Sequence, residues 1–121
     1  MNKLLRKALL FSKVILLPKN KYKRLPQRNT PDSYIKKVNS KGKIIQIRHY
    51  GNDGYVEFDI DFSHHNLPTD HPQTFGGAHK HIYDHMPNNT RRHGPALELT
   101  YEEYIYFILN HKKIQAEIIY V

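Results

Sequence analysis

Histidine is concentrated in one part of this sequence. Six of the nine histidines lie between residues 58 and 85, at His64, His65, His71, His79, His81 and His85. The chain contains no Cys, which excludes disulfides, thiolate nucleophiles and Cys-ligated zinc. Imidazole binds metal ions and exchanges protons near neutral pH. The stretch therefore indicates a metal site or acid–base catalysis, with a solvated loop that does no chemistry as the third interpretation.

The first interpretation is a metal site. On a β-strand, His79 and His81 would point to the same face and could bind one ion. His65 or His71 could supply a third ligand, and Asp59 or Asp61 a fourth ligand or a group that orients an imidazole. A divalent ion such as Zn, Mg or Mn would then polarise a phosphate. The spacing alone is not specific, because no fixed motif such as His-Glu-x-x-His is present.

The second interpretation is RNA cleavage without a metal cofactor. One imidazole would take the proton of the 2′-hydroxyl, and another would protonate the leaving 5′ oxygen. The candidate catalytic residues are His65, His79, His81 and Arg48, whose guanidinium would stabilise the charged phosphorane. The candidate phosphate-binding residues are Lys80, Arg91 and Arg92. His85, His93 and His111 are expected to be surface or structural histidines.

A β-hairpin over residues 43–62 is expected to position this chemistry. Residues 43–50 and 55–62 alternate in polarity, and Asn52, Asp53 and Gly54 form a turn signal between them. The period of two predicts one core face of the second strand, made by Val56, Phe58, Ile60 and Phe62. It places Glu57, Asp59 and Asp61 on the other face, where Arg48 across the hairpin would balance their charge.

The remaining elements complete an α+β prediction with a small antiparallel sheet. A short His-bearing strand is expected near residues 79–84, with loops over residues 63–78 and 86–95. Thr100 and Glu103 form a capping box that begins a helix near residues 101–111. A C-terminal strand is expected near residues 114–120. Tyr104, Phe107 and Ile108 should face the core, with Ile105 and Leu109 widening that face.

The positive charge is confined to the N-terminus. The net charge is +8, yet residues 1–28 carry nine Lys/Arg and no acid, so the rest is nearly neutral. We predict a basic amphipathic helix and linker over residues 1–27, followed by a His-rich domain over residues 28–121. The apolar run at residues 8–17 is interrupted by Lys13 and is too short to span a bilayer. We therefore expect no transmembrane segment, no secretion through this segment and action in the cytoplasm. The basic arm would serve as a packing or oligomerisation helix, or it would contact a membrane surface or nucleic acid.

The string QIRHYGNDGYVEFDIDFSHHNLPTDHPQTFGGAHKHIYD resembles the C-terminal nuclease-like modules of bacterial and prophage polymorphic toxins. The matching positions are Arg48, Tyr50, Asp53-Gly54, Asp59-Ile60-Asp61-Phe62, His65, Pro68, His71-Pro72, His79 and His81, and Arg28-Asn29-Thr30-Pro31 fits the segment that precedes them. The resemblance covers roughly residues 28–85, about half of the chain, and Ala78 stands where the pattern has Pro. It implies a compact α+β hydrolase with a cognate immunity protein as partner. A weaker resemblance, through Ser63-His64-His65 and Gly76-Gly77, is to HNH-type toxin nucleases, which need a divalent metal.

The sequence thus predicts a small toxin-like nuclease that cleaves RNA by histidine acid–base chemistry. Two alternatives remain open. One is a metal-dependent, HNH-like nuclease. The other is a non-catalytic phage protein that binds a metal or nucleic acid.

Overall fold

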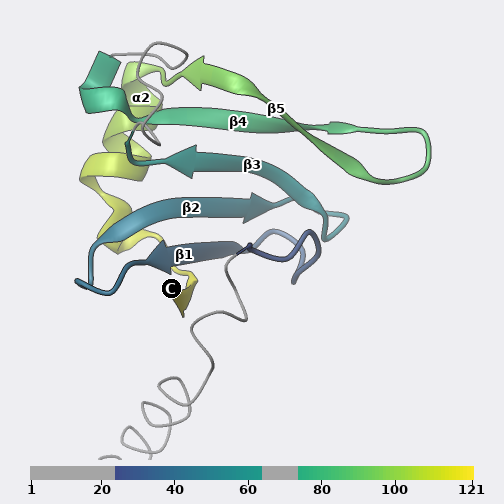
Figure 1. Cartoon of the computed structure of the whole chain (residues 1–121), viewed down its shortest axis with the longest axis horizontal. Helices are drawn as coiled ribbons and strands as arrows, with labels where there is room; N and C mark the ends of the chain where they lie inside the picture. The colour runs from purple at the N-terminus through teal and green to yellow at the C-terminus, as the bar shows by residue number, and fades with distance from the viewer. Residues whose placement is uncertain (1–23, 64–73) are drawn as a thin grey trace, which may run out of the picture.

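The computed structural model describes residues 24–63 and 74–121 (Figure 1). Its centre is a mixed sheet of six strands in the order β5-β4-β3-β2-β1-β6. The strands are β1 (Tyr34–Val38), β2 (Ile44–Tyr50), β3 (Val56–Asp61), β4 (His79–His85), β5 (Arg91–Glu98) and β6 (Glu117–Tyr120). The helical segments are η3 (Thr74–Gly77), α2 (Tyr101–Glu103), η4 (Tyr104–Leu109) and η5 (His111–Lys113). The α+β prediction is confirmed at this level. The predicted N-terminal helix lies outside the described residues.

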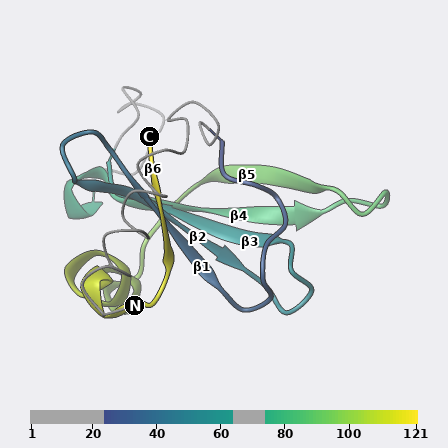
Figure 2. The same ribbon diagram turned by 90° about the horizontal axis from the view of Figure 1, so that it is seen from below.

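The expectation of a purely antiparallel sheet is wrong. Strands β1 to β5 pair antiparallel, but β6 runs parallel to β1, with Ile35 opposite Glu117 and Val38 opposite Tyr120. The helical segments after β5 lie against one face of the sheet (Figures 1 and 2). They return the chain to the opposite edge, and a connection that crosses a sheet in this way can deliver a parallel strand.

The predicted hairpin is confirmed as β2 and β3, but its facing pattern has one error. His49 pairs with Phe58 and the next residue, Tyr50, pairs with Val56, so Glu57 has no opposite partner. This β-bulge reverses the side-chain alternation at one point. Val56 consequently packs with Tyr50 on the other face of the sheet, whereas Phe58 joins the core beneath the helical segment.

The predicted loop at residues 86–95 is also wrong in its second half. The chain turns at Met86–Thr90, where Asn89 adopts a left-handed φ of 62°, and then forms β5. This strand was not predicted from the sequence because it contains Gly94 and Pro95, and both residue types are rare in strand interiors. They lie in a bulge opposite Ile82 on an edge strand, the setting in which a missing N–H is tolerated.

Strand β1 was not expected, and the segment before it packs on the sheet. Ile35 and Val38 are buried despite the two lysines between them. Leu25 is buried as well, and the Gln27 carbonyl accepts a hydrogen bond from the Val56 amide at 2.9 Å. Contact with the sheet therefore begins before residue 28, where the predicted domain starts. The division into arm and domain stays a prediction.

The helical segment follows the predicted capping box but is only briefly α-helical. The Thr100 side chain accepts from the Glu103 amide, and the Glu103 carboxylate accepts from the Thr100 amide. The next six residues, η4, are π-helical, with the Asn110 amide bonded to the Ile105 carbonyl. These wider turns rotate Leu109 away from the sheet, so it is exposed, contrary to the prediction.

The two faces of the sheet differ in chemistry. The face beneath the helical segment carries the main apolar cluster, made by Ile47, Ile60, Ala78, Leu99, Phe107 and Ile114. The other face carries a smaller apolar cluster around Tyr50 and a row of buried polar side chains, namely Arg48, Asp59, Asp61, His79 and His81. Burying charges and imidazoles is costly unless they are paired, so this row is the natural place to look for a site.

Candidate functional site

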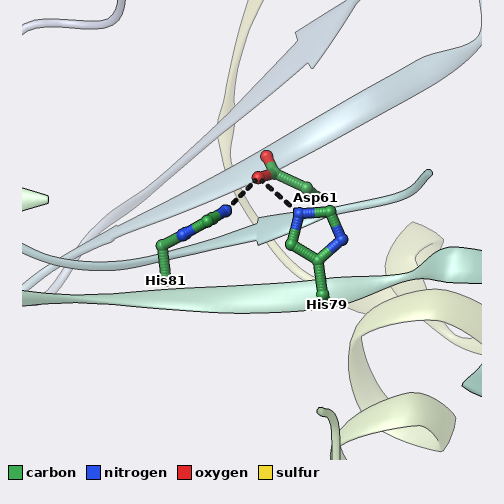
Figure 3. Close-up of side chains that lie close together, drawn as sticks. All are labelled: Asp61, His79 and His81. Carbon is green, nitrogen blue, oxygen red and sulfur yellow. Dashed lines mark ion pairs between the residues drawn. The ribbon is translucent and has the colours of Figure 1, made fainter. Parts of the chain in front are cut away.

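Two histidines and one aspartate converge on the polar face. His79 and His81 alternate along β4, and Asp61 ends β3 directly opposite His79. The Nε2 atoms of His79 and His81 lie 3.3 and 3.2 Å from the same carboxylate oxygen, Oδ2 of Asp61 (Figure 3). All three residues are buried, with 0–5% of their surface exposed. We call this group the Asp61 cluster.

Backbone carbonyls fix the orientation of both imidazoles. The Nδ1 atom of His79 lies 2.8 Å from the Gly77 carbonyl, and Nδ1 of His81 lies 2.9 Å from the Gly94 carbonyl. A carbonyl oxygen only accepts hydrogen bonds, so each Nδ1 carries the proton. In the neutral ring the lone pair is then on Nε2, directed at Asp61. Both rings are thus oriented to use Nε2 as the reactive or ligating atom.

Arg48 lies beside the cluster and is bound to Asp59. Its Nε and Nη2 donate to the two Asp59 carboxylate oxygens at 2.7 and 2.9 Å, which confirms the pairing expected across the hairpin. Its remaining donors reach the Tyr83 hydroxyl and the carbonyls of Leu25 and Pro26. Burial opposes the charge of Arg48, but the contact with Asp59 outweighs it and raises the pKa of Arg48. The structure therefore places Arg48 as a residue that holds Asp59, with its guanidinium buried.

The predicted phosphate-binding residues are not gathered at the cluster. Lys80 points to the helical face, where its Nζ lies 2.8 Å from Glu103. Arg91 pairs with Asp53 at 2.7 Å and lies over the Tyr55 ring. The exposed Arg92 pairs with Asp84 at 3.2 Å. These three cations lie on the opposite face or toward the tip of the β4–β5 hairpin. His65 and His71 lie outside the described residues.

His93 was expected to be a surface or structural histidine, and it is exposed, but it also contacts the cluster. Its ring stacks on His81, with centroids 4.0 Å apart and an interplanar angle of 30°. Burial and the neighbouring His81 both lower the pKa of His93. Burial also lowers the pKa of His81, but the contact with Asp61 and the Gly94 carbonyl outweigh it, so that pKa is raised. Only recognition of β5 in the sequence could have placed His93 here.

The arrangement supports two kinds of chemistry. Two neutral imidazoles with oriented Nε2 atoms can accept protons, and Asp61 can stabilise the imidazolium that results. The same three side chains can instead hold a cation, because one ligand atom from each lies within 4.8 Å of the others. Both uses were expected from the sequence, but the choice of Asp61 rather than Asp59 as the acid that contacts both imidazoles comes from the structure.

Comparisons with known proteins give no relative: no family model, curated protein or solved structure matches the chain. The resemblance to polymorphic-toxin nucleases therefore stays a prediction that rests on the quoted residues. Across residues 24–63 and 74–121, no helix is long and apolar enough to cross a membrane.

Proposed function

We propose that this protein is a small nuclease that cleaves RNA, with the Asp61 cluster as its reactive centre. The observation that carries the proposal is the shared orientation of His79 and His81. Both rings are held at Nδ1 by backbone carbonyls and direct Nε2 toward one carboxylate oxygen. Buried imidazoles that are held in a fixed orientation around a buried carboxylate are typical of functional sites.

Phosphodiester cleavage needs the functions that this cluster can supply. A nucleophile must lose a proton, and the negative charge that forms on the phosphate must be stabilised. Oriented Nε2 atoms serve either as proton acceptors or as ligands of an ion that performs both tasks. The nine Lys/Arg of residues 1–28 would add attraction to the phosphate backbone that does not depend on sequence and weakens with salt.

The toxin-like role is part of the same proposal and rests on the quoted sequence pattern. A nuclease of this kind would act in the cytoplasm and harm the cell that makes it. An immunity protein that neutralises it would then be its protein partner. Expression of the wild-type protein should slow growth, and His81→Ala should relieve that effect.

A second candidate is a non-catalytic protein that binds a metal ion or nucleic acid. The near-complete burial of Asp61, His79 and His81 favours it, because substrate must reach a catalytic group. Closed sites are typical of structural metal ions, whereas catalytic sites keep an open position.

The deciding experiment is a cleavage assay with purified full-length protein. Labelled RNA and DNA are each incubated with EDTA or with added Zn²⁺, Mn²⁺ or Mg²⁺. His81→Ala should abolish cleavage, whereas His85→Ala, which removes an exposed imidazole from the same strand, should not. Cyclic phosphate ends in the presence of EDTA would assign acid–base chemistry to the imidazoles. Absence of cleavage in every reaction would refute the nuclease and favour the binding protein.

A further inference from the structure

We propose that the Asp61 cluster is a zinc site, in which Asp61 Oδ2 and the Nε2 atoms of His79 and His81 are the protein ligands. The inference deepens the proposed function and rests on it for the meaning of the ion in catalysis. The site itself is argued from geometry alone. Zinc binding can therefore be tested whether or not the protein cleaves RNA.

The first argument is the spacing of the ligand atoms. Zinc bonds of about 2.0–2.1 Å in tetrahedral geometry place neighbouring ligand atoms roughly 3.3–3.4 Å apart. The two Nε2–Oδ2 distances are 3.3 and 3.2 Å. Charge-assisted hydrogen bonds are shorter, about 2.7–2.9 Å, and the Arg48–Asp59 pair in this protein has them at 2.7 and 2.9 Å. Two of the three distances between ligand atoms therefore match those in a tetrahedral zinc site, and all three atoms lie within 4.8 Å of one another.

The second argument is the direction of the lone pairs. With Nδ1 donating to a carbonyl, neutral His79 and His81 each direct an Nε2 lone pair at the Asp61 carboxylate. The carboxylate and the two lone pairs repel one another unless a proton on Nε2 or a bound cation lies between them. One bound divalent ion would satisfy both imidazoles and the carboxylate together. Histidine ligands of zinc commonly donate their other ring N–H to a backbone carbonyl, as both do here.

The donor set selects the kind of ion. Two imidazole nitrogens and one carboxylate oxygen suit zinc and its first-row neighbours. Magnesium and calcium prefer shells made of oxygen atoms. Two histidines with one carboxylate also form the protein part of known catalytic zinc sites, in which water or substrate takes the next position. The same set would therefore serve the proposed hydrolysis.

Gly94 links the backbone to this site. A Cβ at this position would lie 2.3 Å from the Ile82 carbonyl oxygen, so only glycine lets β5 approach β4 this closely. The close approach brings the Gly94 carbonyl to His81 Nδ1. Gly94 is consequently a positioning residue for the ligand atom on the opposite side of that ring.

The test is zinc binding by the full-length protein. Chelator-treated protein is titrated with Zn²⁺, Mg²⁺ and Ca²⁺ by calorimetry, and bound metal is counted after dialysis. We expect one Zn²⁺ per chain, a melting temperature that rises with Zn²⁺ concentration, and no comparable effect of Mg²⁺ or Ca²⁺. Asp61→Asn and His81→Ala should each weaken zinc binding by at least about 10-fold. His85→Ala, the matched control on β4, should bind as the wild type does.

A measurement on the wild-type protein covers the case in which a variant does not fold. In ¹⁵N spectra of the histidine rings, Zn²⁺ should shift the Nε2 resonances of His79 and His81 and leave their Nδ1 atoms protonated. Substoichiometric binding, unchanged affinity in folded Asp61→Asn, or shifts confined to other histidines would overturn the zinc site. Zinc binding without RNA cleavage would refute only the nuclease, and cleavage by protein that binds no zinc would refute only this inference.

Discussion

The buried pair of Arg48 and Asp59 gives the most direct test of how this polar face is stabilised. We consider Arg48→Met, which keeps much of the side-chain length and removes the charge and every donor. Asp59 is only 1% exposed and would lose both hydrogen bonds to the guanidinium. The Tyr83 hydroxyl would remain as a donor to Asp59 at 2.7 Å.

The expected loss in the free energy of unfolding is large. Removing one partner of a buried ion pair typically costs about 3–5 kcal/mol, because the other charge stays buried without compensation. The Leu25 carbonyl also loses its donor from Arg48, which adds about 1 kcal/mol or more if water does not replace it, whereas the Pro26 carbonyl keeps the Tyr50 hydroxyl as a donor. A domain of this size is stable by about 5–15 kcal/mol, so Arg48→Met removes a major part of the total.

Urea unfolding followed by far-UV circular dichroism measures this loss, with tyrosine fluorescence as a second probe because the chain has no Trp. The matched control is the double variant Arg48→Met/Asp59→Asn, in which no charge is stranded. It should be more stable than Arg48→Met alone. A loss below about 1 kcal/mol in Arg48→Met, or a double variant that is less stable than the single one, would refute the reasoning.

Three further predictions concern other parts of the fold. Gly94→Ala should weaken zinc binding and lower the melting temperature, because its Cβ would lie 2.3 Å from the Ile82 carbonyl oxygen; unchanged values in both assays would contradict this. Thr100→Ala should cost about 1 kcal/mol in urea unfolding, since it removes the acceptor of the Glu103 amide; Thr100→Ser should restore it. Burial raises the pKa of Tyr50 to about 12. The unfolded chain ionises first, near pH 10, so stability should fall between pH 10 and pH 12; Tyr50→Phe should make that fall shallower.

The sequence by itself determined the features that depend on neighbours along the chain. Alternating residues around a turn signal predict the β2–β3 hairpin, and the period of two places His79 and His81 on one face. The cross-strand pairing of Arg48 with Asp59 follows from the same hairpin. The capping box at Thr100 is a four-residue pattern. In each case the contacts that stabilise the feature lie within one element or one turn.

Tertiary structure decided which of these groups meet. Pairing with β4 makes a strand of β5 despite Gly94 and Pro95, and that pairing brings His93 and the Gly94 carbonyl to His81. A single bulge on β3 moves Val56 to the other face, which no period can foresee.

The parallel pairing of β6 with β1 likewise depends on tertiary structure, because the helical segments that precede β6 must bring the chain to the β1 edge of the sheet. These outcomes rest on hydrogen bonds and packing between residues distant in sequence. The free energy of such contacts overrides local preference. The sequence therefore predicts the two imidazoles. Only the tertiary structure shows that Asp61 and the Gly77 and Gly94 carbonyls are their partners.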